Sequence, residues 1–481
     1  MTDTQRLELG LLLWKPWVLA AVFSVGIFVG GCDVFDEDIE RIEGKRISIL
    51  IGDQELVPDA KTASLKVYLP RPHTNKNWPQ AGGVASHVMG HLAAKGGLSP
   101  VWEESIGVGT NEEVRLLSTP IVADGRVFTI DTSSQVMAFD ADTGEEIWDT
   151  NITPNSDDCS SDGTDEKTWA VENWQELCQT FDDWFTFGSE ESMGGGLAYE
   201  NGLVFITTGF AHLIALDAKD GKEVWRQSLP GPMRASPTVQ DGRIFVITID
   251  NQLVTLSTET GEKLWSHTGI MESTGMLGGA SPAVAKGVVV VPYSSGELFA
   301  LRTSNGRPLW SDNLGAVNVL DAVSSLSNIR GRPIIDGNRI IAISHSKRMV
   351  ALDLRSGLRV WERSIGGIQS PWLAGDFIYL LTGENKLVCM TKADGLVVWV
   401  AALRKYEDVE DKEHLIIWSG PVLVGDRLIV MGSHGLALAI SPYTGRLLGR
   451  VEMSDPVRIE PIVVGEMVYV LTEEADLIAL R

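Results

Sequence analysis

The stretch MVALDLRSGLRVW at residues 349–361 joins an alternating apolar run to a second short run that ends in tryptophan. Copies recur as MAFDADTGEEIW at 137–148, IALDAKDGKEVW at 214–225 and VTLSTETGEKLW at 254–265. Weaker copies end at Trp310 and Trp399, and a further copy has Gly449 in place of the tryptophan. Alternation with a period of two is typical of a buried strand, so each copy predicts a β-hairpin.

The turn inside each copy has its own signature. A glycine stands there in seven copies, from Gly144 to Gly445, as expected where the backbone must adopt a left-handed conformation. Four residues earlier most copies carry a short polar residue, such as Asp140 or Asp353, whose side chain can bond to the turn backbone. Arg302 is the exception at this position.

A second motif precedes each hairpin: a proline, four or five residues, a glycine and an apolar strand. Examples are TPIVADGRVF from Thr119, SPTVQDGRIF from Ser236 and RPIIDGNRII from Arg332. Each repeat therefore holds four short strands. The turn glycines from Gly221 to Gly445 are 40, 45, 51, 38 and 50 residues apart, which is the spacing of four-stranded propeller blades.

The number of copies indicates how the ring closes. The inner-strand signature appears eight times and ends for the last time at Arg481, so the eighth copy lacks its tryptophan strand. A strand of that kind, PVWEESIG with Trp102, stands near the start without an inner strand before it. We therefore predict an all-β fold: an eight-bladed β-propeller of four-stranded antiparallel blades, closed by an N-terminal strand that removes two sheet edges.

Composition limits the partners of this chain. Its 481 residues carry a net charge of −24, and the charged residues among the first 31 sum to zero, so removal of that segment would leave the charge unchanged. Nucleic acid and an anionic membrane surface are therefore disfavoured as direct partners. The repeat count indicates one large domain with appendages rather than two or three domains.

The amino terminus has the pattern of an export signal. The apolar run PWVLAAVFSVGIFVGG ends at residue 31, follows Lys15 and is shorter than a bilayer span. Residues 29–32, VGGC, resemble a bacterial lipobox, which predicts a signal peptide over 1–31 and lipidation of Cys32. An uncleaved signal anchor is the alternative. Residues 32–76 are expected to form a tether and 77–481 the propeller, with Trp78 packed on it.

An acidic insertion is predicted at residues 151–192, which hold eleven Asp or Glu against the single Lys167. Cys159 and Cys178 lie inside it, and in an exported protein we expect them to form a disulfide, unless they stay reduced or pair elsewhere. A loop from Asp158 fits a calcium-binding EF-hand in part, but Trp169 occupies the position of its final glutamate. A solvated acidic loop is the preferred interpretation.

Other candidate residues favour structural roles. His87 and His91 are four residues apart, but Val88 stands where a zinc protease has glutamate. Cys389 occupies a slot that small alanines fill in the other repeats, and the charged run 405–414 is typical of a solvated loop. Because the sequence contains no nucleophile elbow, phosphate loop or metal-ligand cluster, we predict no catalytic residue, no metal site and no cofactor.

The repeat is similar to that of propellers related to pyrroloquinoline quinone (PQQ) enzymes. Together with the lipobox, the eight copies, ALDLRSG at 351–357 and SPYTGRLLGR at 441–450, it makes the chain from Cys32 onward resemble the BamB family of lipoproteins. That resemblance implies a non-enzymatic scaffold of the β-barrel assembly machinery, lipid-anchored to the periplasmic face of the outer membrane. Such a scaffold docks on the periplasmic domains of the barrel subunit BamA, joins other machinery components and aids insertion of unfolded outer-membrane proteins.

The resemblance also implies a docking surface on the loops that enter two consecutive blades. The matching positions are Thr274, Met276, Leu277, Asn328 and Arg330. Here the chain departs from the family, because Leu277 replaces an arginine, and Asn328 and Arg330 replace acidic residues. We expect Met276 and Leu277 to be apolar anchors and Arg330 to meet a carboxylate of the partner.

Asp33 follows the lipidated cysteine, and in some enteric bacteria an aspartate at this position retains lipoproteins in the inner membrane. Residue 33 therefore bears on whether the chain is sorted to the inner or the outer membrane.

Two further function classes stay open. A PQQ-dependent quinoprotein dehydrogenase resembles this fold, but such enzymes use adjacent cysteines, and no two of Cys32, Cys159, Cys178 and Cys389 are adjacent. A lipid-anchored ligand-binding propeller is the other alternative.

Overall fold

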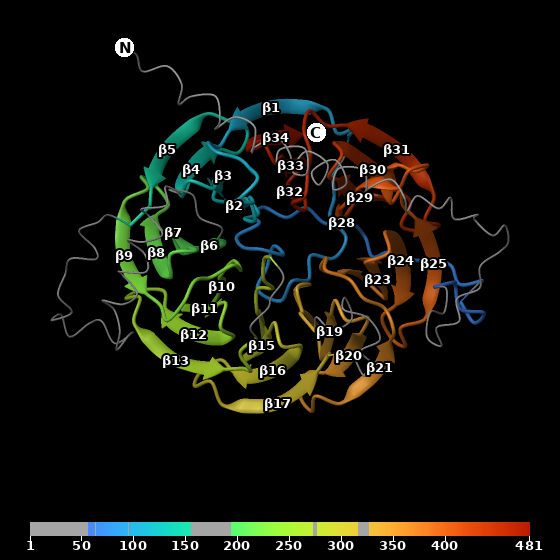
Figure 1. Ribbon diagram of the computed structural model, residues 1–481, viewed down its shortest axis with the longest axis horizontal. Helices are drawn as coiled ribbons and strands as arrows, with labels where there is room; N and C mark the ends of the chain where they lie inside the picture. The colour runs from blue at the N-terminus through green and yellow to red at the C-terminus, as the bar shows by residue number, and fades with distance from the viewer. Residues whose placement is uncertain (1–55, 63, 95, 155–193, 273–276, 316–326) are drawn as a thin grey trace, which may run out of the picture. The chain divides into compact units, whose positions relative to one another are not determined.

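The computed structural model describes residues 56–62, 64–94, 96–154, 194–272, 277–315 and 327–481. These residues form 34 β-strands and no helix, so the described part contains no helix that could cross a membrane. Thirty-two of the strands form eight antiparallel sheets of four strands, and two form a separate hairpin. The sheets are the blades of a ring (Figure 1), which confirms the predicted eight-bladed β-propeller.

The blades are numbered here in chain order, each from its innermost strand outward. Blades 1 to 4 are β2(Ile121–Ala123), β3(Arg126–Ile130), β4(Gln135–Asp140), β5(Glu146–Asn151); β6(Gly196–Glu200), β7(Leu203–Thr207), β8(His212–Asp217), β9(Glu223–Ser228); β10(Thr238–Gln240), β11(Arg243–Ile247), β12(Gln252–Ser257), β13(Lys263–Thr268); and β14(Ala283–Ala285), β15(Val288–Pro292), β16(Glu297–Arg302), β17(Pro308–Asn313).

Blades 5 to 8 continue the ring in the same way, except that blade 8 takes its outermost strand from near the start of the chain. They are β18(Ile334–Asp336), β19(Arg339–Ile343), β20(Met349–Asp353), β21(Arg359–Arg363); β22(Trp372–Ala374), β23(Phe377–Leu381), β24(Lys386–Thr391), β25(Val397–Ala402); β28(Trp418–Val424), β29(Arg427–Gly432), β30(Leu436–Ile440), β31(Leu447–Glu452); and β32(Ile462–Val464), β33(Met467–Leu471), β34(Asp476–Leu480), β1(Pro100–Ser105).

The turn between the third and fourth strands follows the chemistry of its sequence motif. In blade 5 the carboxylate Oδ1 of Asp353 accepts hydrogen bonds from the backbone N–H of Ser356 at 2.9 Å and from its hydroxyl at 2.8 Å. The N–H of Gly357 donates to the carbonyl of Asp353 at 2.8 Å. Gly357 has a φ of 72°, a conformation that side-chain-bearing residues rarely adopt, so the glycine makes this tight turn possible.

Each motif tryptophan locks its blade to the next one. The ring of Trp310 lies over Gly357 of the following blade, and its indole N–H donates to the carbonyl of Leu354 at 2.9 Å. A side chain at the turn position would collide with the indole ring, which is a second reason for glycine there. The same pairing occurs seven times: Trp102 with Gly144, Trp148 with Gly221, Trp225 with Gly261, Trp265 with Gly306, Trp310 with Gly357, Trp361 with Gly395, and Trp399 with Gly445.

The exception in blade 7 has a geometric cause. Gly449 of β31 occupies the tryptophan position, and nothing lies within 4 Å of the place where its side chain would begin. The next blade has no turn between its third and fourth strands, because its fourth strand, β1, comes from near the start of the chain. The tryptophan and the turn glycine that it would cover are therefore both absent at the junction between blades 7 and 8.

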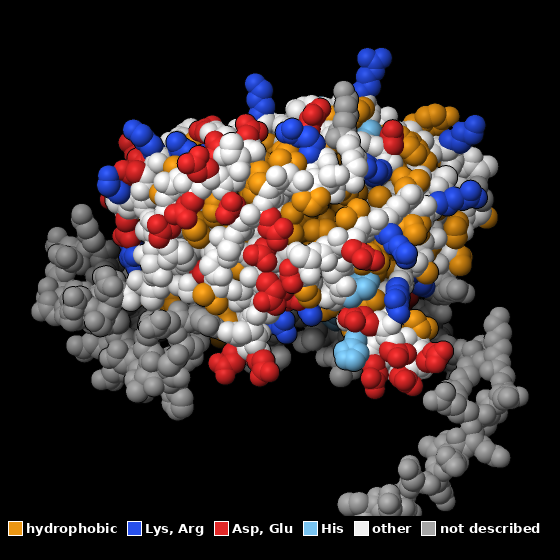
Figure 2. Space-filling model, turned by 90° about the horizontal axis from the view of Figure 1, so that it is seen from above, with side chains coloured by type: hydrophobic (Ala, Val, Ile, Leu, Met, Phe, Trp, Pro, Cys, Tyr) orange, Lys and Arg blue, Asp and Glu red, His pale blue; other side chains and the backbone are white. Residues whose placement is uncertain are grey.

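The ring closes through β1, which pairs antiparallel with β34 from Pro100 opposite Leu480 to Ser105 opposite Asp476. Figure 1 shows the two strands side by side as the outer part of blade 8. This is the pairing that the sequence predicts. Figure 2 looks onto the rim near β1, where hydrophobic side chains lie in bands among charged ones.

The hydrophobic core lies between blades. Third-strand residues such as Ala351 and Val388 are fully buried and belong to clusters that join neighbouring sheets. Cys389 is likewise fully buried, opposite Tyr379 and Trp399, in the small-residue slot predicted for it. Burial raises the pKa of its thiol, so this cysteine is held in the neutral, unreactive form.

A segment of residues 70–94, called the strap below, circles the central axis once. It forms hydrogen bonds with all eight blades in ring order. The bonding groups are Asn75 with blade 8, Trp78 with blade 1, Pro79 with blade 2, Gln80 with blade 3, Ala85 with blade 4, Ser86 with blade 5, Gly90 with blade 6 and Leu92 with blade 7. Figure 1 shows this segment in blue across the centre of the ring.

The strap and the residues before it differ from the expected tether over 32–76. The backbone N–H of Asp59 donates to Val397 at 2.9 Å, and Val67 is buried against blade 6. Asn75 is bonded to blade 8. The described part of the expected tether, from residue 56 onward, therefore packs on the propeller, because backbone groups along the inner strand ends need hydrogen-bond partners. Trp78, only 1% exposed, packs on the ring as predicted.

The charged run at 405–414 also has more structure than expected. It forms most of a two-stranded hairpin of β26(Tyr406–Asp408) and β27(Glu413–Leu415) between blades 6 and 7. Most of its residues are exposed, in agreement with the expected solvation.

Candidate functional site

The two faces of the propeller differ. The strap bonds to the ends of the first strands, next to the turns that lead into the second strands, as at Val122 and Gly425. The opposite face, called the open face below, is formed by the loops that lead into the first strand of each blade. Because the strap covers one end of the central axis, the open face gives access to the interior along that axis.

An axial cavity of about 380 Å³ lies at the centre of the open face. Most of its lining comes from the residues just before the first strand of a blade. Six of these stand directly before the proline of the repeat: Thr119, Ser236, Ser281, Arg332, Ser370 and Glu460. The strap contributes Ala81 to the lining. Six of the eight blades thus present the same repeat position to the axial cavity.

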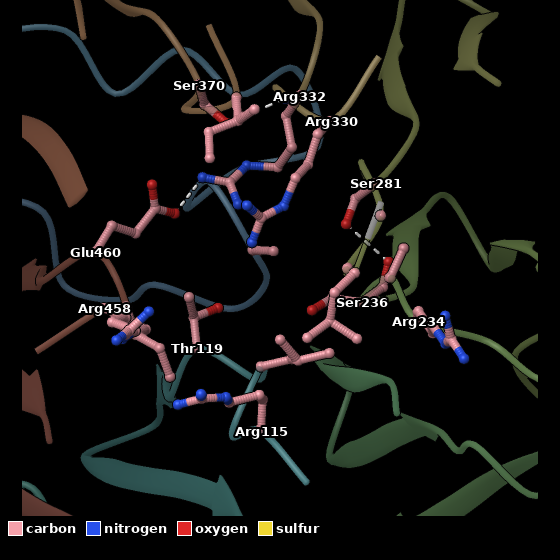
Figure 3. A pocket seen from close by; sticks show the side chains of 18 of the residues that line it. Arg115, Thr119, Arg234, Ser236, Ser281, Arg330, Arg332, Ser370, Arg458 and Glu460 are labelled. Atoms are coloured by element: carbon pink, nitrogen blue, oxygen red, sulfur yellow. Dashed lines mark hydrogen bonds and ion pairs between the residues drawn. The ribbon is translucent and has the colours of Figure 1, made fainter. Parts of the chain in front are cut away.

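The lining of the axial cavity is strongly basic. It contains five arginines and two glutamates, and no lysine or aspartate: Arg115, Arg234, Arg330, Arg332, Arg458, Glu460 and Glu473. Its formal charge is therefore three positive, in a chain whose net charge is −24. Figure 3 shows Arg330 and Arg332 entering from one side, with Arg115 and Arg458 on the other.

Ion pairs engage three of these arginines, and one of the pairs links two blades across the axis. Arg332 of blade 5 binds the carboxylate of Glu460 in blade 8. Glu473 accepts from Arg458 at 2.8 Å and from Arg115 at 3.3 Å. The backbone N–H of Arg332 also donates to the hydroxyl of Ser370 at 3.0 Å. These contacts hold the lining in place where the loops meet.

Arg330, like Arg234, differs from the three paired arginines of the cavity. It has no hydrogen bond or ion pair with any residue that the structure describes, although it is partly buried and its guanidinium points toward the middle of the cavity (Figure 3). Burial, and the neighbouring charge of Arg332, lower the pKa of Arg330. An unpaired cation in such a place is energetically costly.

A second pocket of about 410 Å³ adjoins the axial cavity and shares Arg234, Ala235, Gly278 and Gly279 with it. Its rim is apolar and exposed: Ile249 is 41% and Met271 68% exposed. Ile270, beside Met271, is 59% exposed. Large exposed apolar side chains that gather next to a pocket are typical of a protein-binding surface.

Three of the five predicted docking residues line these two pockets. Leu277 is partly buried and lines the axial cavity together with Arg330. Asn328 lines the second pocket but is only 5% exposed, so its side chain is less accessible than a docking residue requires. Thr274 and Met276 lie outside the described residues. The structure thus brings together Leu277, Asn328 and Arg330, which come from loops entering blades 4 and 5.

Other residues singled out in the sequence have the following places. Cys32, Cys159, Cys178 and most of the insertion 151–192, including the calcium-like loop, lie outside the described residues. His87 Nδ1 binds the carbonyl of Pro333 at 2.7 Å, and His91 contacts the carbonyls of Pro70 and Gly425, so both histidines fasten the strap. In the described ranges no three His, Cys, Asp or Glu side chains gather in a way that could hold a metal ion.

Comparison with known proteins identifies relatives over most of the chain. The family model described as outer membrane protein assembly factor BamB matches residues 90–179, 158–401 and 408–481. The outer membrane protein assembly factor BamB of Salmonella typhimurium is 26% identical over 381 residues, which cover 79% of this chain and 88% of the relative. The protein of the same name from Escherichia coli is 25% identical over 362 residues, covering 75% and 83%.

Solved structures show the same fold. The crystal structure of BamB from Moraxella catarrhalis superposes with a TM-score of 0.61 at 16% identity and covers 80% of this chain and all of that one. The quinohemoprotein alcohol dehydrogenase of Comamonas testosteroni superposes with a TM-score of 0.59 at 13% identity, covering 88% and 83%. At these identities the likeness concerns the fold alone.

Proposed function

The chain belongs to the family of the outer membrane protein assembly factor BamB, and from that premise we propose that it is a non-enzymatic assembly factor for outer-membrane proteins. The observation that carries the proposal is the family match over the whole propeller, together with the exposed apolar rim on its open face. A rigid ring that presents loops from eight blades on one face suits a scaffold.

Docking is proposed to use the open face. The apolar side chains of Ile249, Ile270 and Met271 form the rim, and Leu277 continues the surface toward the axis. Apolar side chains surrounded by polar ones are the usual anchors of a protein interface. The partner we propose is the periplasmic domain region of a BamA-like barrel subunit, with other machinery components and unfolded outer-membrane proteins nearby.

The position of Arg330 changes how we expect it to contact the partner. Because its guanidinium points into the axial cavity, a partner carboxylate would have to reach into that cavity to meet it. Asn328, which is buried, is expected to support the loop rather than to contact the partner. The proposed interface therefore depends on the apolar rim, with Thr274, Met276 and Leu277 on the adjoining loop.

Anchoring is proposed to follow from lipidation of Cys32 after removal of residues 1–31. Acyl chains at that position would hold the propeller at the periplasmic face of the outer membrane. Metabolic labelling with a fatty acid should mark the full chain and leave a Cys32→Ser variant unmarked. Membrane fractionation of an Asp33→Ser variant beside the parent chain tests whether Asp33 affects sorting.

The docking proposal is tested by co-purification from detergent-solubilised envelopes. A Met276→Asp/Leu277→Asp double variant and a Met271→Asp variant should each release the barrel subunit, because a buried unpaired carboxylate opposes association. The matched control is Leu358→Asp, which changes a 69% exposed leucine in a turn on the strap side. All variants should keep the parent melting temperature, and unaltered co-purification of both docking variants would remove this surface from contention.

A further inference from the structure

We propose that the axial cavity of the open face binds a small anion that carries two or three negative charges on carboxylate or phosphate groups, with Arg330 as its principal contact. The proposal goes beyond the assembly function and does not depend on it. It concerns a ligand of the isolated protein, whereas docking is proposed to use the apolar rim and Leu277 at the edge of the cavity.

The first support is the charge of the lining. Five arginines converge on a cavity of about 380 Å³ against two glutamates. The rest of the chain is acidic, with 64 Asp and Glu against 40 Lys and Arg, so a basic lining is contrary to the overall composition. Cavities lined by one sign of charge concentrate counter-ions, and the balance of this lining fits a ligand with two or three negative charges.

The ion pairs do not account for all of this positive charge. Arg332 with Glu460 connects blades 5 and 8, Arg115 and Arg458 share Glu473, and these contacts have a structural role. Arg330 has no such partner among the described residues, yet its guanidinium points into the cavity. An arginine placed there destabilises the unliganded protein unless an anion neutralises it. Planar guanidinium groups match carboxylate and phosphate oxygens in geometry as well as charge.

Two residues of the cavity lining also have hydrogen-bond donors without a partner among the described residues. Nε of Arg332 and the hydroxyl Oγ1 of Thr119 are buried and have no hydrogen-bond partner among the described residues. Both residues line the axial cavity, one on each side in Figure 3. Buried polar groups in native proteins are nearly always bonded, and these two unbonded donors belong to residues of the cavity lining, although the atoms themselves are covered.

The volume of the axial cavity limits the size of the ligand. The strap is fastened across the far end of the axis, where Ala81 lines the cavity and His87 is bonded to the carbonyl of Pro333. A ligand therefore enters and leaves through the open face. The volume is near the lower end of the range of small-molecule sites, which fits a compact polyanion rather than a polymer chain.

The test uses the propeller as a soluble form that begins at Asp33, titrated by calorimetry with pyrophosphate and, separately, with citrate. Sodium chloride matches the ionic strength throughout, because screening alone weakens such contacts. We expect saturable one-site binding and a rise in melting temperature with at least one probe. Preference for pyrophosphate indicates a phosphate ligand, and preference for citrate indicates a polycarboxylate.

Two variants locate the site. Arg330→Gln should weaken binding about tenfold or more, while Arg330→Lys, which keeps the charge, should retain part of it. Without ligand, Arg330→Gln should melt no lower than the parent, because it removes an unpaired cation. The matched control Arg450→Gln changes an exposed arginine of β31 on the rim and should bind like the parent. Absence of saturable binding of both probes, or equal loss in Arg450→Gln, overturns the proposal.

Discussion

Trp102 lies against Gly144 across the junction between the last blade and the first. A Cβ atom at Gly144 would stand 2.8 Å from the indole Cδ2, and the indole N–H donates to the carbonyl of Ala141 at 3.3 Å. The same indole ring packs beside Tyr469, with ring centroids 5.8 Å apart. The N-terminal strand β1 therefore closes the ring with the same tryptophan–glycine pairing that joins the other blades, although β1 is far in sequence from the other three strands of its blade.

We expect this lock to be a major contribution to stability. Trp102→Ala should lower the free energy of unfolding by about 3 kcal/mol, because it removes a large packed side chain at the closing junction. Gly144→Ala should cost about 2 kcal/mol, because the position has a φ of 79° and no room for a methyl group. Urea denaturation measures both. Gly449→Ala, where the space is open, should change stability by less than about 0.5 kcal/mol, and equal effects at both glycines would contradict the lock.

The strap should depend on Gln80. Its side-chain carbonyl accepts from the backbone N–H of Val239 at 2.8 Å, in the innermost strand of blade 3. Gln80→Ala should cost about 1–3 kcal/mol, because it leaves buried backbone groups without a partner. Gln240→Ala is the matched control, since that amide binds only the exposed Asp241. Thermal unfolding compares the two variants, and a loss no greater in Gln80→Ala than in the control would mean that the strap bond is dispensable.

Stability should fall with acidity through His87. Burial, and the nearby charge of Arg332, lower the pKa of this histidine from 6.5 to about 3. Between these values the unfolded chain binds a proton that the folded chain does not. Acidification therefore lowers the free energy of unfolding by up to about 1.4 kcal/mol per pH unit between these values. Above pH 6.5 His87 is neutral in both states, and this loss of stability is absent.

An exchange at His87 isolates this effect. In His87→Asn the amide can still donate to the carbonyl of Pro333, but it has no proton to gain. The parent should lose about 2 kcal/mol more than the variant between pH 6.5 and pH 5, by urea denaturation at each pH. Carboxylates titrate in both proteins and cancel in the difference. Parallel pH profiles would show that His87 is not responsible.

Cysteine chemistry tests the predicted disulfide. Cys389 is buried and its pKa is raised, so it should react with iodoacetamide only after unfolding. A soluble form that begins at Asp33 contains three of the four cysteines. If Cys159 and Cys178 are bonded, unfolding without reductant exposes one reactive thiol, and unfolding with reductant exposes three. Three alkylated thiols without reductant, counted by mass spectrometry, would refute the bond.

The axial cavity could have been found in the sequence by one further step. The residue directly before the repeat proline lines the cavity wherever that proline opens the first strand, as Ser236 and Arg332 do. Among these residues, Arg332 and Glu460 replace the hydroxyl side chains of the other repeats. A charged residue directly before the repeat proline, where other repeats have serine or threonine, therefore indicates a charged cavity at the axis.

The strap gave no such signal. Residues 70–94 are rich in polar residues, glycine and proline, and they do not repeat, so the sequence predicted only a tether up to residue 76 and the start of the propeller at residue 77. Their order comes from hydrogen bonds to residues far away in the chain, such as Trp78 with Val122 and Leu92 with Gly425. No local pattern encodes such contacts, because the partner groups meet only after the blades have formed.

By itself the sequence determined the number of blades, the four strands in each and the closure by Trp102, because alternation, turn glycines and tryptophans are local features that repeat. Only the tertiary structure decided that the strap circles the axis, that Arg330 points into a cavity without a carboxylate partner among the described residues, and that Asn328 is buried. The physical reason is that each of these depends on where separate blades converge, and convergence at an axis is a property of the closed ring.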